Sequence, residues 1–134
     1  MSLKTLLFVA LACVAGECGA HHSYAAEFDA NNPMTIEGVV REVWFKNPHI
    51  RYYIDVTDED GNTVTFDARG LAPVKLARLG WTKKTIQVGD QIKLYGHIGH
   101  TNKTIMSIID ITLTDGTVLT SRSVAYDITD DEKE

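Results

Sequence analysis

The sequence has 134 residues, of which 44% are hydrophobic and 23% are charged, and its formal net charge is -5. These values describe one small globular domain and exclude a protein of several domains. The acidic balance also argues against nucleic acid as a partner, because a polyanion is bound by a positive stripe of lysine and arginine side chains.

Residues 1–20 have the pattern of a secretory signal peptide. Lys4 gives a positive start, an apolar run follows, and small residues precede the bond after Ala20. The apolar run is shorter than the roughly 20 residues that a membrane-spanning helix needs. We therefore expect cleavage after Ala20, a periplasmic or secreted protein, and no stable membrane span once the signal is removed. Lipidation at Cys13, which follows an imperfect lipobox, is the alternative.

Both cysteines, Cys13 and Cys18, lie inside this signal segment. The mature chain, residues 21–134, then contains no thiol. Disulfides, thiol catalysis, iron–sulfur clusters and cysteine-bound zinc are therefore excluded for the mature protein.

Short strands separated by turn residues follow the signal, with one helix in the middle. The predicted elements are strands at 35–45, 49–56, 63–68, 91–98, 104–113 and 117–119, and a helix at 73–79. We divide the chain into the signal (1–20), a leader of the mature chain (21–34), a β domain (35–120) and an acidic tail (121–134).

The apolar residues change phase within the first strand, which predicts a bulge or a strong bend. The second strand alternates cleanly, with Ile50, Tyr52 and Ile54 on the inner face. A turn at 58–62 joins it to the third strand in a hairpin, and we expect Val64 and Phe66 to face inward there.

The helix is expected to begin at Pro73, which suits a first helical turn, and to end before Gly80. Leu76 and Leu79 are expected to face the core, and Trp81 to pack where the helix ends. Three strands, a helix and further strands, with a bent first strand, predict an all-β fold with one short helix: a small OB-like five-stranded barrel. An open β-sandwich is the competing arrangement.

The five histidines are the main candidates for a site: His21, His22, His49, His97 and His100. If cleavage follows Ala20, His21 offers both an amino nitrogen and an imidazole, a chelating pair suited to Cu(II). His97 and His100 are three residues apart, so on a continuous strand they point to opposite faces. An exposed leader at His21 and His22, and a turn-capping role for His49, are the simpler interpretations.

No pattern typical of catalysis is present. Serines outside the signal lie in no nucleophile-elbow sequence, and paired carboxylates occur only in turns and in the tail. We therefore expect a binding module with no catalytic residues. Copper-dependent oxidase chemistry stays open, and it would need an open coordination position and a substrate surface.

Four short segments of the chain resemble a family of small exported bacterial proteins that has no assigned function. They are the leader from His21 to Asp29, Gly38-Val39-Val40, Asn47-Pro48-His49 and Gly80-Trp81-Thr82. The resemblance covers the mature chain and implies export, a cut before His21 and a small β-barrel, but no chemistry. The chain departs from that family's pattern before the helix, where it has Gly70-Leu71-Ala72-Pro73 in place of a Ser-Pro-Asn segment.

We hypothesise that the protein binds copper as its cofactor through His21, with His22 and His49 as further metal ligands. The alternative is a metal-free interaction module that holds a partner protein or a small apolar ligand. In that case we expect the site on the outer face of the second strand, at Arg51 and Tyr53, and on the fourth strand, at Lys93 and Tyr95, which we take to be its neighbour.

Overall fold

Six strands, the helix α3 and a helical turn at 24–27 follow one another along residues 24–121, the part of the chain that the computed structural model describes. In chain order, the labelled elements are β1 (Phe28–Trp44), β2 (Arg51–Thr57), β3 (Thr63–Arg69), α3 (Pro73–Arg78), β4 (Gln91–Gly99), β5 (Ile105–Leu113) and β6 (Val118–Thr120). Each predicted element is present. Only β1 differs by more than a few residues, because its start at Phe28 also pairs with β4.

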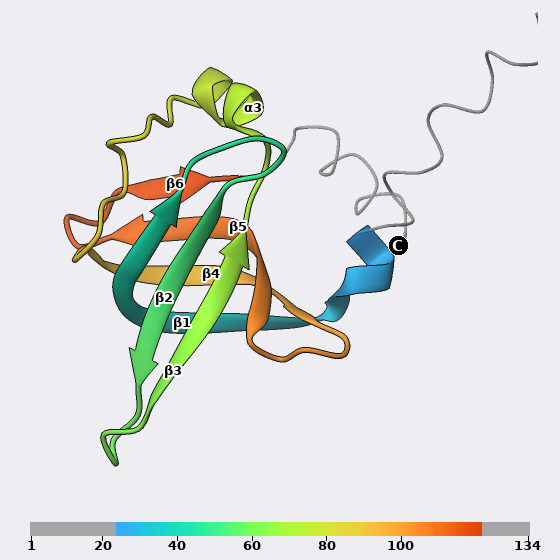
Figure 1. The fold of residues 1–134 in the computed structure, drawn as a ribbon, viewed down its shortest axis with the longest axis vertical. Helices are drawn as coiled ribbons and strands as arrows, with labels where there is room; N and C mark the ends of the chain where they lie inside the picture. The colour runs from blue at the N-terminus through green and yellow to red at the C-terminus, as the bar shows by residue number, and fades with distance from the viewer. Residues whose placement is uncertain (1–23, 122–134) are drawn as a thin grey trace, which may run out of the picture.

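The first five strands close into a ring, as Figure 1 shows. β1 pairs antiparallel with β2 and β4, β2 pairs antiparallel with β3, and β4 pairs antiparallel with β5. A parallel pairing of β3 with β5 completes the ring, and β6 adds to the free edge of β5. The closed ring confirms the predicted OB-like barrel and excludes the open sandwich.

Local irregularities in the strands agree with the sequence pattern. The pairing of β1 with β2 shifts register between Val40 and Glu42, which confirms the predicted bulge. The hairpin of β2 and β3 is in regular register from Thr57↔Thr63 to Arg51↔Arg69. The prediction for Val64 was wrong: its side chain is 45% exposed, because the outer end of this hairpin extends beyond the barrel core.

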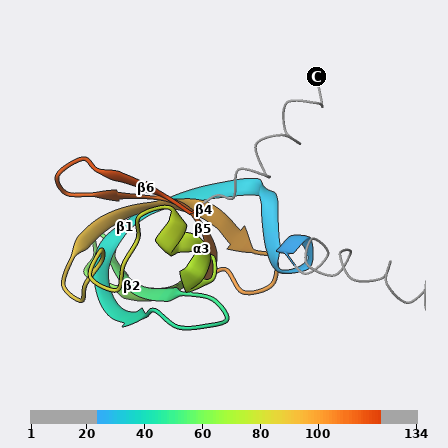
Figure 2. The ribbon, with the colours of Figure 1, turned by 90° about the horizontal axis from the view of Figure 1, so that it is seen from above.

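The helix α3 lies over one end of the ring, as Figure 2 shows from above. Pro73 occupies its first turn, Leu76 is fully buried, and Gly80 follows the helix with a positive φ of 87°. Trp81 is 2% exposed, which confirms its predicted packing. Leu79 was wrongly expected to face inward: it is 43% exposed, because the helix has already ended at Arg78.

The core consists of residues from every strand of the ring together with the helix and Trp81. Its members include Ile36, Val40, Ile50, Tyr52, Ile54, Phe66, Leu76, Leu94, Met106 and Ile111. Tyr52 belongs to this core as predicted, and burial raises the pKa of its hydroxyl. Within residues 24–121, no helix is long and apolar enough to cross a membrane.

Asp58 organises the turn of the β2–β3 hairpin and provides a test of that turn. Its Oδ1 accepts the backbone N–H groups of Asn62 at 2.8 Å and Asp60 at 3.0 Å. The N–H of Asn62 is the leading cause that holds the pKa of the Asp58 carboxyl below its usual value. A lowered folded-state pKa stabilises the fold above the unfolded pKa, and this contribution is lost as pH falls through the folded one.

We expect Asp58→Ala to lower the unfolding temperature at pH 7 and to lower it less as the pH falls below about 4. Circular dichroism melts at both pH values measure the difference. Glu59→Ala is the matched control, because the Glu59 carboxylate accepts none of the hydrogen bonds of this turn among the described residues. An Asp58→Ala deficit that stayed constant with pH would contradict this role.

Candidate functional site

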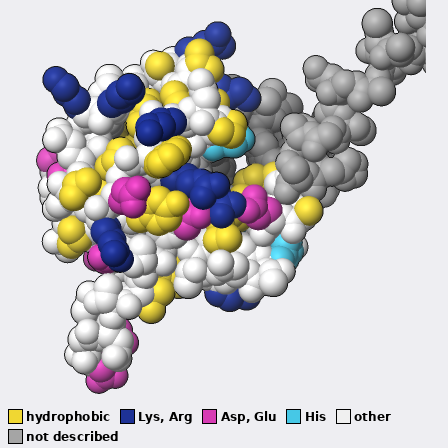
Figure 3. All heavy atoms as spheres, viewed as in Figure 1, with side chains coloured by type: hydrophobic (Ala, Val, Ile, Leu, Met, Phe, Trp, Pro, Cys, Tyr) yellow, Lys and Arg dark blue, Asp and Glu magenta, His cyan; other side chains and the backbone are white. Residues whose placement is uncertain are grey.

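A row of four side chains crosses the outside of the barrel on β1, β2, β3 and β5. Trp44 is paired with Arg51, Arg51 with Arg69, and Arg69 with Ser107. Directly paired residues project to the same face of a sheet, and the neighbours Tyr52 and Ala68 are in the core. The row therefore lies on the outer face of the barrel, where Ser107 is buried and contacts the Tyr24 hydroxyl. Figure 3 shows basic, acidic and hydrophobic side chains gathered on this side of the molecule.

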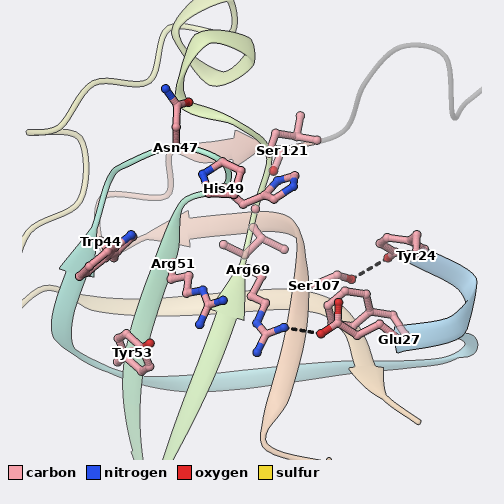
Figure 4. Close-up of a pocket in the computed structure, with 15 residues that line it drawn as sticks. Tyr24, Glu27, Trp44, Asn47, His49, Arg51, Tyr53, Arg69, Ser107 and Ser121 are labelled. Carbon is pink, nitrogen blue, oxygen red and sulfur yellow. Dashed lines mark hydrogen bonds and ion pairs between the residues drawn. The ribbon is translucent and has the colours of Figure 1, made fainter. Parts of the chain in front are cut away.

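A pocket of about 650 Å³ opens over this row. It is bounded by the helical turn at 24–27, the end of β1, the segment from Asn47 to His49, the ends of β2 and β3, and β5. The lining residues are Tyr24, Glu27, Phe28, Trp44, Asn47, Pro48, His49, Arg51, Tyr53, Arg69, Gly70, Leu71, Ser107, Ile108 and Ser121. Figure 4 shows how their side chains surround the space. The volume lies in the range of small-molecule sites.

The two arginines of the pocket differ in how fully they are paired. Arg69 donates from Nε and Nη2 to Asp67 Oδ2, at 3.0 and 2.8 Å, and from Nη1 to Glu27. The hydrogen bond to Asp67 is the leading cause that raises the pKa of Arg69. Arg51 makes one long contact, 3.5 Å from Nη1 to the same Asp67 oxygen, and its side chain is 40% exposed. Arg51 is thus the arginine that can take a new partner.

Two oxygen atoms beside the pocket are buried and have no hydrogen-bond partner among the described residues. They are Asp67 Oδ1 and Ser121 Oγ. Ser121 itself is 3% exposed and lines the pocket. Buried polar atoms in folded proteins are nearly always hydrogen-bonded, so the Ser121 hydroxyl is an exception among the described residues.

Contacts from the helical turn at 24–27 hold the start of the described chain against the barrel. The Tyr24 hydroxyl is 2.6 Å from Ser107 Oγ and 2.9 Å from His97 Nδ1. His100 Nε2 is 3.1 Å from the Ala25 carbonyl, and the His100 N–H donates to the Glu27 carbonyl at 3.0 Å. Residues 28–34 of the predicted leader belong to β1. These contacts hold the turn at 24–27 at the rim of the pocket.

The structure describes one of the three predicted histidine ligands. His49 is exposed and lines the pocket, whereas His21 and His22 lie outside the described residues. His97 and His100 both contact the turn at 24–27, because β4 ends at Gly99 and does not continue to His100 as a strand. Within residues 24–121, no group of three histidine, cysteine or acidic side chains could hold a metal ion.

The surface predicted for the alternative function is brought together only in part. Arg51 and Tyr53 both line the pocket. β4 was wrongly taken as the neighbour of β2, because β1 lies between them. Lys93 is 2.6 Å from Glu37 at a separate recess of about 230 Å³ on the far side of β1.

Sequence reasoning missed Trp44 and Arg69 as pocket residues. The predicted hairpin contained the signal for Arg69, because counting outward from the turn pairs it with Arg51. Trp44 could not be found in this way, since the bulge after Val40 changes which residue of β1 faces Arg51.

A family model described as a family of unknown function, DUF6152, matches residues 9–106, more than half of the chain. The chain belongs to the DUF6152 family. No curated protein matches it. The matched region includes Trp44, Arg51 and Arg69 but ends one residue before Ser107.

Two solved structures are similar to this member of the DUF6152 family. One is the mitochondrial single-stranded DNA binding protein Rim1 from S. cerevisiae, with 18% sequence identity, a TM-score of 0.48, and coverage of 65% of this chain and 94% of that chain. The other is the N-terminal domain of the PriB protein from Thermoanaerobacter tencongensis, with 18% identity, a TM-score of 0.45, and coverage of 63% and 97%. At these values, neither likeness says what this chain binds.

Proposed function

We propose that the protein is an exported binding domain that holds copper at the rim of the pocket, through the amino terminus created by cleavage before His21. The observation that carries the proposal is that Tyr24 and His49 line the same pocket. The Tyr24 hydroxyl is fixed by Ser107 and His97, so the chain enters this part of the molecule at a defined place.

The short stretch before Tyr24 supports this proposal. His21 precedes Tyr24 by three residues, so their Cα atoms lie at most about 11 Å apart. Two imidazole nitrogens on one ion are at most about 4 Å apart, because each metal–nitrogen bond is near 2 Å. Tyr24 and His49 line one pocket, and the few residues between His21 and Tyr24 support the proposal that the His21 nitrogens reach His49.

The chemistry of the donors matches Cu(II). The amino nitrogen and imidazole of His21, with imidazoles from His22 and His49, form a nitrogen-rich set of the kind that Cu(II) prefers in a tetragonal arrangement. Of these proposed ligands, His49 lies in the described part of the chain. Periplasmic or secreted localisation belongs to the same proposal, because signal cleavage creates the amino ligand.

The test begins with the intact mass of the exported protein, which is expected to correspond to a chain starting at His21. Cu(II) is then titrated, with EPR spectra, into the wild type, a variant with one extra glycine before His21, and His49→Gln. We expect both variants to lose about tenfold or more in affinity and the extended chain to change its EPR spectrum. Glu59→Gln, in the exposed turn between β2 and β3 and outside the pocket lining, is the control.

Two outcomes would contradict the copper proposal. A mature chain that starts elsewhere than His21 has no amino ligand at that residue. Equal affinity and equal spectra for the wild type and the extended chain would remove the amino-terminal chelate, even if the metal still bound elsewhere.

The pocket also favours a second candidate function, a metal-free module that binds a small ligand with an apolar part. The specific observation is that Trp44, Arg51 and Tyr53 line one cavity of small-molecule size. This function needs neither signal cleavage at Ala20 nor the terminal histidines. It is tested with metal-free protein, as described below.

A further inference from the structure

We infer that the pocket binds a small organic acid, a single carboxylate joined to a flat apolar body. The inference rests on the second candidate function, the metal-free binding module, and names the class of its ligand. It is independent of copper.

Arg51 is the group that would receive the carboxylate. A guanidinium has five N–H donors in a fork that matches a carboxylate. Among the described residues, the Arg51 side chain uses one of them, at the long distance of 3.5 Å to Asp67 Oδ2. Arg69, next to it in the row, directs three of its donors to Asp67 and Glu27. The pair therefore leaves one arginine fork facing the pocket, as Figure 4 shows.

Trp44 and Tyr53 provide the surface for the apolar body. Trp44 is paired with Arg51 across β1 and β2 and is 43% exposed. Tyr53 lies two residues along β2 from Arg51, so its side chain is on the same face. Lys46 Nζ lies 4.2 Å from the centre of the Trp44 ring system, which adds positive charge at this wall. The Trp44 and Tyr53 rings beside the Arg51 guanidinium therefore suit a ligand that has both an aromatic ring and an acid group.

The acidic residues near the site do not favour a cation as the ligand. Both arginines contact Asp67 Oδ2, and Glu27 pairs with Arg69. The formal charges of Arg51, Arg69 and Lys46 against those of Asp67 and Glu27 leave three minus two, or one, positive charge at the site, which favours a monocarboxylate over a phosphate dianion.

The two tryptophans allow a direct test by NMR, because Trp44 is 43% exposed in the pocket and Trp81 is 2% exposed in the core. Mature protein labelled with nitrogen-15 and freed of metal by a chelator is titrated with phenylacetate and with its neutral analogue phenylacetamide. We expect the Trp44 indole signal to shift and the Trp81 signal to stay in place. We expect phenylacetate to bind about tenfold more tightly than the amide, because only its carboxylate forms a charged hydrogen bond with the Arg51 guanidinium.

Arg51→Gln is expected to reduce the affinity for phenylacetate to that of the amide and to leave amide binding unchanged. Arg41→Gln is the matched control, because it removes the same charge from a 64% exposed side chain on β1 outside the pocket. Arg51→Lys, which keeps the charge without the fork, is expected to have an intermediate affinity. Unfolding midpoints of all variants show whether the fold is retained.

Each alternative outcome has a definite meaning. Equal binding of acid and amide at Trp44 overturns the carboxylate inference but supports the second candidate function. An equal loss in Arg41→Gln and Arg51→Gln also overturns the inference, because general charge would then explain the preference. A Trp44 signal that moves with neither compound overturns both the inference and the metal-free function.

Discussion

Replacing Trp81 by alanine is expected to lower the free energy of unfolding by about 3–5 kcal/mol, the range for a large buried aromatic residue. The ring of Trp81 is 2% exposed and belongs to the core cluster. Its backbone N–H donates to the Leu76 carbonyl at 3.0 Å, so the residue also fixes the chain where α3 ends. For a domain of this size, the unfolding temperature should fall by about 20 °C.

Urea unfolding followed by circular dichroism measures the loss at Trp81, and Trp44→Ala is the matched control. Trp44 is 43% exposed, so its removal is expected to change stability by less than about 1 kcal/mol. The same control should abolish the binding of phenylacetate. Equal destabilisation by the two substitutions would contradict the assignment of Trp81 to the core and of Trp44 to the pocket.

The barrel could be predicted from the sequence because its signals are local. Alternation in β2, the turn residues at 58–62 and Pro73 at the start of α3 each act over a few residues. The order of strands and helix then leaves few topologies. The errors at Val64 and Leu79 have one cause: both residues continue the apolar pattern past the point where the core ends.

The pocket could be predicted only in part because it depends on contacts between distant segments. Arg51 and Tyr53 were found from the outer phase of a single strand, and His49 from its motif. The parallel pairing of Arg69 with Ser107, and the placement of Tyr24 on Ser107, follow from closure of the ring. Neither contact has a signature in the neighbouring sequence.

Gly96 connects the stability of the barrel to the position of this site. A Cβ atom on Gly96 would lie 1.8 Å from the carbonyl oxygen of Ser107 on β5. This is backbone and not the end of a flexible side chain, so β4 and β5 would have to separate locally. Ser107 holds the Tyr24 hydroxyl at 2.6 Å, and a shift of its backbone would also move the turn at 24–27.

We therefore expect Gly96→Ala to lower the free energy of unfolding by about 2–3 kcal/mol, as overpacked sites do. Urea unfolding measures the loss, and the amide signals of residues 24–27 report the movement of the turn. Gly116→Ala is the matched control: Gly116 has a φ of 87° with no atom within 4 Å of an added Cβ, so only backbone strain of about 1 kcal/mol is expected. If Gly96→Ala were no more destabilising than Gly116→Ala, this result would contradict the close contact between Gly96 on β4 and the Ser107 carbonyl on β5. Ser107 would then not be the residue that fixes Tyr24 at the rim of the pocket.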